Sequence, residues 1–135
     1  MADDTQETIP LHTNDGSTGY RIVKFQAMAA DTAKLQQSVL KIYKVEQTTI
    51  DDDIDFSDNR LLGAIYFTKN DDTKYPIVQS TIFDNEVFNQ DIYITHKDAS
   101  TGEPLNYYIE LEQMKLDLTA TTAATLKDIR NESRP

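Results

Sequence analysis

The clearest feature of the chain is a period-two pattern of apolar and polar residues, which is the pattern of β-strands. In GYRIVKFQAM, residues 19–28, the apolar residues Val23, Phe25 and Ala27 alternate with polar ones, which predicts a half-buried strand. LLGAIYFTK, residues 61–69, is apolar almost throughout. A strand of that composition is expected at the centre of a sheet, with both faces covered.

A third stretch, SVLKIYKVEQ, is open to two interpretations. Val39 and Ile42, with Leu35 before them, fit the spacing of a helical stripe. Val39, Ile42 and Tyr43 are also the β-branched and aromatic types that favour a pleated surface. We therefore predict a strand.

Turn-forming residues separate the remaining strands and predict two hairpins. YPIVQSTIF follows KNDDTK, and its Pro76 lies near the start of the strand, where a missing backbone donor is tolerated. QDIYITHKD, residues 90–98, and NYYIELEQMKLD, residues 106–117, are separated only by ASTGEP. A short connection with glycine is typical of a hairpin between them.

The last of these strands contains a change of phase. The apolar residues from Tyr107 to Leu111 share one parity, whereas Met114 and Leu116 have the other. One extra residue in a strand turns every later side chain to the opposite face. We therefore predict a β-bulge near Glu112.

Only the C-terminal residues have a helical pattern. Side chains recur there at spacings of four and three, namely Leu118, Thr122, Leu126 and Ile129. The stripe is thin and the helix is short, so it would be marginal without packing. We therefore predict a C-terminal helix whose Leu126 and Ile129 lie on the sheet or on another chain.

Together these elements predict an all-β fold. Many short strands with turns between them have few other ways to cover their apolar faces than a single antiparallel β-sandwich or barrel, here of about six strands. The expected division is an extended N-terminal arm at residues 1–19, the β-domain at residues 20–117, and a short C-terminal helix and tail at residues 118–135.

The expected arm, MADDTQETIPLHTNDGSTG, is polar, acidic and rich in turn formers. Only Ile9, Pro10 and Leu11 offer apolar contact, which is too little to offset the entropy lost when the segment becomes ordered on its own domain. One interpretation is a disordered leader. The other is an arm that becomes ordered on a neighbouring subunit through Ile9, Pro10 and Leu11.

Composition excludes several function classes. The chain has 135 residues, which suits one domain, and no cysteine for disulfides, thiolate metal sites or nucleophiles. With 23 acidic and 13 basic residues its net charge is -10, which disfavours binding to nucleic acid and to anionic membranes. No apolar run approaches the ~20 residues of a membrane span, and the N-terminus lacks a signal-peptide pattern. We expect a soluble product.

The stretch TTIDDDIDFSDNR raises the question of metal binding, because it holds five aspartates within eight residues. An EF-hand loop needs glycine at its sixth position and a bidentate glutamate at its twelfth. Counted from Asp51, these positions hold Phe56 and Leu62, so the motif is absent. A looser calcium site built from Asp51, Asp53 and Asp55 stays an alternative. We instead expect a solvated connection whose charge blunts a sheet edge or meets basic residues of another chain.

No catalytic motif accompanies this stretch. His12 lies in the N-terminal segment and His96 in a strand, where a surface position is expected, so the two are not expected to form a metal site. The chain has only 4 glycines and no phosphate-binding GxxxxGK run. We therefore predict neither an enzyme activity nor a cofactor.

Four stretches carry a resemblance to a known class of proteins: LLGAIYFTKNDD, FDNEVFNQDIYITHKD, NYYIELEQMKLD and ATLKDIRN. They resemble small virion structural proteins of tailed bacteriophages, over roughly residues 20–131 and in the order of elements rather than in any catalytic motif. The resemblance implies a non-enzymatic β-sandwich subunit, present in many copies on a symmetric protein lattice. Such proteins commonly use terminal arms for contacts between subunits.

The function implied is that of a capsid decoration or cement protein, with a head–tail connector, adaptor or tail component as the alternative. The implied partners are the major capsid protein or other virion proteins, with the chain itself a homo-oligomer in the particle. The implied location is the virion, after synthesis in the host cytoplasm. From the residues alone, a small β-domain that binds carbohydrate or calcium and an enzyme accessory subunit also stay open.

Overall fold

A computed structural model describes residues 1–13, 16–31, 33–69 and 78–116. These ranges contain seven strands and no helix. The strands are β1 (Thr5–Ile9), β2 (Thr18–Ala29), β3 (Gln36–Tyr43), β4 (Leu61–Lys69), β5 (Val78–Phe83), β6 (Ile92–Asp98) and β7 (Leu105–Lys115). The predicted C-terminal helix, with Leu126 and Ile129, lies outside the described residues.

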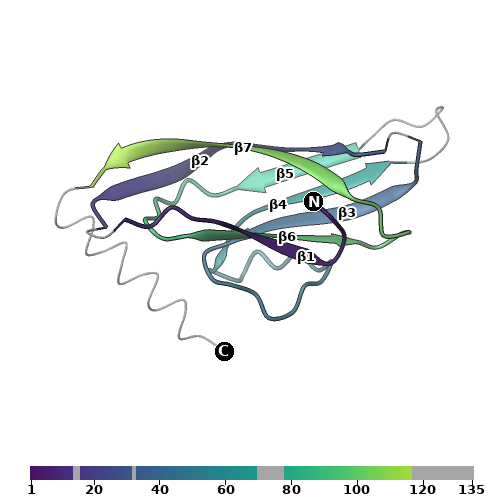
Figure 1. The fold of residues 1–135 in the computed structure, drawn as a ribbon, viewed down its shortest axis with the longest axis horizontal. Helices are drawn as coiled ribbons and strands as arrows, with labels where there is room; N and C mark the ends of the chain where they lie inside the picture. The colour runs from purple at the N-terminus through teal and green to yellow at the C-terminus, as the bar shows by residue number, and fades with distance from the viewer. Residues whose placement is uncertain (14–15, 32, 70–77, 117–135) are drawn as a thin grey trace.

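The strands form two antiparallel sheets. One has five strands in the order β1-β6-β3-β4-β5, and the other is the pair β2-β7. Figure 1 shows the β2–β7 pair lying along one side of the five-stranded sheet. The prediction of an all-β, antiparallel fold is confirmed, and so is the pairing of β4 with β5. The strand beyond the expected six is β1.

The core lies between the two sheets and takes side chains from both. Ile22 and Phe25 of β2 and Leu40, Ile65 and Ile94 of the larger sheet are each at most 2% exposed. Full burial of such a side chain stabilises the fold by roughly 1.5–3 kcal/mol. A two-stranded ribbon is marginal alone, so β2 and β7 depend on this shared core.

The register of β2 against β7 shifts between Ile22 and Lys24, which leaves Val23 as the extra residue of a bulge. The bulge allows Ile22 and Phe25, three positions apart, to face the core together. Val23 is 43% exposed, so the prediction that it shares a face with Phe25 is wrong. The register shift is in β2, whereas the sequence predicted a bulge in the partner strand β7 near Glu112, so the predicted position of the bulge is wrong.

β6 and β7 belong to different sheets, so the predicted hairpin between them is wrong. At the end of β6, the Asp98 carboxylate accepts hydrogen bonds from the N–H groups of Gln37, Gly102 and Glu103 at 3.0, 2.9 and 2.7 Å. Gly102 has a φ of 84°, which favours glycine. These contacts hold the connection as it passes to Leu105 in the second sheet. The turn residues mark where β6 ends, but they do not select its partner.

β3, rather than β4, is the central strand of the larger sheet. The prediction that these residues form a strand is confirmed. Its core face includes Leu40 and Ile42, and its outer face includes Val39 and Lys41, with both faces buried. Figure 1 shows that the connection from β3 to β4, residues 44–60, lies on the side of this sheet opposite to β2 and β7.

The N-terminal residues are ordered on their own domain. β1 pairs with β6, from Thr5 opposite His96 to Ile9 opposite Ile92. The amino group of Met1 donates to the Leu105 carbonyl, and the Leu105 N–H donates to the Met1 carbonyl, both at 2.9 Å. This differs from the expected arm without contacts on its parent domain, because the open edge of β6 supplies backbone partners that a count of apolar residues ignores. A role on a neighbouring subunit stays a prediction.

Candidate functional site

The acidic connection at residues 44–60 is organised by a buried cation, Lys41. Its side chain is 3% exposed on the outer face of β3. Nζ donates to Asp51 Oδ1 at 2.6 Å and to the Asp53 carbonyl oxygen at 2.7 Å. It also lies 5.6 Å from the centre of the Tyr43 ring. The sequence pattern did not reveal this role, because nothing local to β3 shows that its outer face is covered.

Lys41 is charged at neutral pH. Burial disfavours the ammonium, but the hydrogen bonds with Asp51 and Tyr43 outweigh this effect and raise the pKa of Lys41 above its ordinary value. An internal ammonium therefore supplies positive charge among carboxylates that would otherwise repel one another.

Two further aspartates of the connection have partners of their own. Asp58 accepts hydrogen bonds from Arg60 Nε and Nη2, each at 2.9 Å, in a forked arrangement. This contact holds the pKa of Asp58 below its usual range. Asp55 Oδ1 accepts from the N–H and the hydroxyl of Ser57 at 2.9 and 2.5 Å. Both contacts stabilise the turn that leads into β4.

The three candidate calcium ligands therefore make different contacts. Asp51 binds Lys41, Asp53 offers Lys41 its backbone carbonyl, and Asp55 binds Ser57. In the part of the chain that the structure describes, no three His, Cys, Asp or Glu side chains converge as metal ligands would. A calcium ion at Asp51 would also have to compete with an ammonium 2.6 Å away.

We expect chelation to leave the thermal stability unchanged, because a cation of the chain itself already stabilises the acidic connection. The melting temperature should be the same in calcium and in EDTA. A fall of more than about 5 °C in EDTA, on the order of 1 kcal/mol for a domain of this size, would contradict the prediction. Asp53→Asn serves as the control, since it changes a candidate ligand but keeps the carbonyl that binds Lys41.

His96 is buried, so the expectation of a surface position is wrong. It is 0% exposed because its side chain lies on the same face of the sheet as its β3 partner Leu40, which belongs to the core between the sheets. Its Nδ1 lies 3.0 Å from the Ala2 carbonyl oxygen and its Nε2 lies 2.9 Å from Ser38 Oγ. His12 instead lies 2.6 Å from Asp91, so the two histidines serve separate contacts.

Stability is expected to fall as the pH drops below about 6.5, the ordinary pKa of histidine. Burial lowers the pKa of His96, and only part of this effect is offset by the Ala2 carbonyl and the nearby Asp3 and Asp98 carboxylates; the N-terminal amino group adds to it. The unfolded chain therefore binds the proton more readily, and stability is lost at up to about 1.4 kcal/mol per pH unit. Full stability is present above the unfolded pKa.

Urea unfolding at about pH 7.5 and about pH 5.5 measures this dependence, in a range where histidine is the main titrating side chain. The difference should persist in His12→Asn and disappear in His96→Gln. An equal difference in His96→Gln would assign the dependence to other groups.

The interface residues predicted from sequence lie in different environments. Ile9 and Leu11 are partly buried against the core of their own chain. Pro10 is exposed between them. Leu126 and Ile129 lie outside the described residues. The structure therefore does not bring this predicted set together on one described surface.

A different apolar surface lies on the outer face of β4 and β5. It consists of Phe56, Tyr66, Val78 and Ile82, which are 62%, 42%, 52% and 57% exposed, and we call it the β4–β5 patch. Tyr66 lies opposite Ser80, between Val78 and Ile82 on the same face. Phe56 and Ile82 border one shallow hollow of about 220 Å³. Sequence analysis missed the patch, although adjacent Ile82 and Phe83 cannot both face the core.

Within the described ranges there is no helix with the length and hydrophobicity that a bilayer crossing requires. Comparison of the chain with protein-family models, with curated proteins and with solved structures finds no match.

Proposed function

We propose that this protein is a non-enzymatic structural subunit of a tailed-phage virion, most simply a decoration or cement protein that stabilises the capsid. The proposal rests on the sequence resemblance together with one structural observation, the β4–β5 patch. It assigns the small β-sandwich the task of covering neighbouring virion subunits, with the major capsid protein as the main partner. Its place would be the virion, after synthesis in the host cytoplasm.

The β4–β5 patch supports an assembly role because large apolar side chains gain stability when they are removed from water. Full burial of one such side chain is worth roughly 1.5–3 kcal/mol. Contiguous apolar surface on a soluble domain is typical of protein contacts. Tyr66, Val78 and Ile82 lie on strands whose backbone is already hydrogen-bonded in the sheet, so little backbone entropy is lost when a partner covers them.

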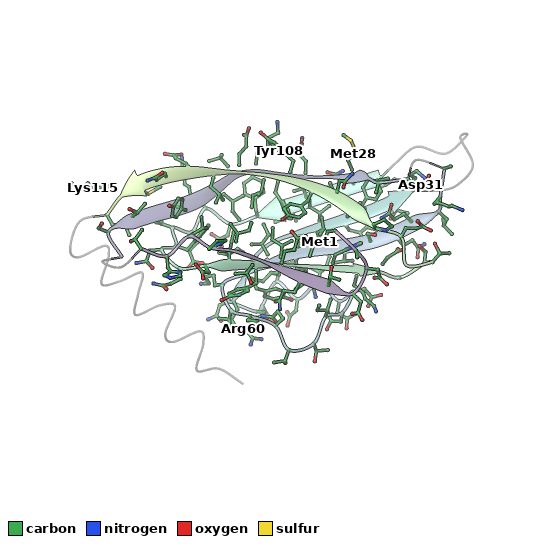
Figure 2. All side chains as sticks on the ribbon, in the orientation of Figure 1. Met1, Met28, Asp31, Arg60, Tyr108 and Lys115 are labelled. Carbon is green, nitrogen blue, oxygen red and sulfur yellow. The ribbon has the colours of Figure 1, made fainter. Side chains whose placement is uncertain are left out.

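The proposal requires a gene for a major capsid protein near this one, and the test uses shells assembled from that capsid protein. The full chain should sediment with the shells, and the double variant Phe56→Ser, Ile82→Ser should bind about tenfold more weakly. Met28→Ser is the matched control, since Met28 is 72% exposed on β2, and Figure 2 shows it on the side of the molecule opposite to Arg60 at the end of the acidic connection. Binding to purified necks or tails instead would favour the connector, adaptor or tail alternative. If the chain binds none of these particles, and no terminase, portal or capsid gene lies near its own gene, the proposal is refuted.

A hollow beside the acidic connection favours a second candidate function, carbohydrate binding. It measures about 450 Å³ and is bordered by Tyr43, Gln47, Thr48 and Asp55 among others. Hydroxyl, amide and carboxylate groups beside an aromatic ring can bind a sugar through its hydroxyls and its apolar face. Titration of the isotope-labelled protein with neutral oligosaccharides tests this function, and shifts confined to Tyr43 and Gln47 would support it.

A further inference from the structure

The surroundings of the β4–β5 patch are strongly acidic. Residues 41–60 and 84–86 contain three cations and eight carboxylates. Asp84 borders the same hollow as Phe56 and Ile82. Its Oδ1 accepts a hydrogen bond from the Glu86 N–H at 2.8 Å, which leaves its negative charge in place.

The cations of these segments are already paired with carboxylates. Lys41 binds Asp51, and Arg60 binds Asp58. Lys44 Nζ lies 2.9 Å from Glu86 Oε1. Among the described residues, the salt bridges therefore leave uncompensated negative charge beside an exposed apolar surface.

We propose that the β4–β5 patch binds a different protein whose apolar contact residues are flanked by lysine or arginine. The inference rests on the proposed function, because it specifies the surface chemistry of the virion partner. Apolar contact would supply affinity at Phe56, Tyr66 and Ile82. Basic residues of the partner would meet Asp84 and the acidic connection, which favours this partner over others and accelerates its approach.

Charge complementarity also argues against the other occupants. A symmetric contact between two copies would place Asp84 and the acidic connection of each copy close to those of the other. An anionic membrane surface would be repelled by the same charges. A basic protein surface is the occupant that satisfies both the apolar and the charged part of the site.

Three capped hexapeptides test the inference with the full-length, isotope-labelled protein. In the first, lysine alternates with leucine; in the second, glutamate replaces lysine; in the third, serine replaces leucine. The lysine–leucine peptide should shift the amide signals of Phe56, Tyr66 and Ile82. The other two peptides should bind at least about tenfold more weakly than the lysine–leucine peptide.

Variants locate the binding and separate charge from apolar contact. Phe56→Ser, Ile82→Ser should weaken the lysine–leucine peptide about tenfold, whereas Met28→Ser should leave it unchanged. Asp84→Asn keeps the acceptor for Glu86, so it should stay folded and still weaken this peptide. If the lysine–serine peptide binds as tightly as the lysine–leucine peptide, unspecific charge attraction accounts for the binding, and the inference is overturned.

Two further results would also overturn it. Equal binding of the glutamate–leucine peptide would remove the need for a basic partner. A dimer in sedimentation that dissociates in Phe56→Ser, Ile82→Ser would make a second copy the occupant. If the chain binds shells and these substitutions do not weaken that binding, only this inference is refuted. If the lysine–leucine peptide binds at the patch but the chain does not bind shells, only the virion function is refuted.

Discussion

Asp51→Ala is expected to lower the free energy of unfolding by about 3 kcal/mol, whereas Lys41→Met is expected to lower it by less than about 1 kcal/mol. Both changes remove the same ion pair. They differ in what they leave behind, because the Lys41 side chain is 3% exposed and the Asp51 side chain is 51% exposed.

Without Asp51, the Lys41 ammonium stays buried with uncharged partners, the Asp53 carbonyl and Tyr43. An unpaired buried charge is strongly destabilising. Without the Lys41 ammonium, the half-exposed Asp51 carboxylate is hydrated by water, and methionine preserves the apolar stem. Replacement of the buried Lys41 by methionine, a hydrophobic side chain of similar length, is therefore expected to be tolerated.

Urea denaturation at neutral pH measures both variants. Asp52→Ala is the matched control, since the described residues provide its side chain with no ion pair, and its effect should stay within about 0.5 kcal/mol. Equal losses in Lys41→Met and Asp51→Ala would mean that the pair itself, rather than the stranded ammonium, sets the stability of the connection.

Deletion of residues 2–9 is expected to remove at least about 3 kcal/mol of stability, because it strips apolar and hydrogen-bonded contacts from β6 together. Ile9 packs against the core, and the backbone carbonyl of Ala2 contacts the buried His96 ring. The deletion also removes Glu7, whose carboxylate accepts a 2.6 Å hydrogen bond from the Tyr107 hydroxyl on β7. β1 thus joins the two sheets at this edge.

The midpoint of urea unfolding checks this deletion. Thr8→Ala, an exposed position on β1, should change the midpoint little. Unchanged stability of the deleted protein would show that the segment contributes little to its own domain. It would then be free to act as the intersubunit arm that its sequence suggests.

Local patterns alone determined where most of the strands lie. The apolar run at residues 61–69 and the alternation around Phe25 require extended, buried segments whatever their partners are. Composition likewise determined the strongly acidic character, with a net charge of -10. These properties depend on residues that are neighbours in the chain, so they can be read without a fold.

The tertiary structure decided which distant segments meet. β6 could pair with β7 or with β1 and β3 on local evidence, and the choice follows from where the backbone edges and the shared core lie. The same choice buried His96 on the core face of β6 and placed Lys41 beneath the acidic connection. Burial and ion pairing of these residues arise from contacts across the chain, which a period of two or a run of aspartates does not encode.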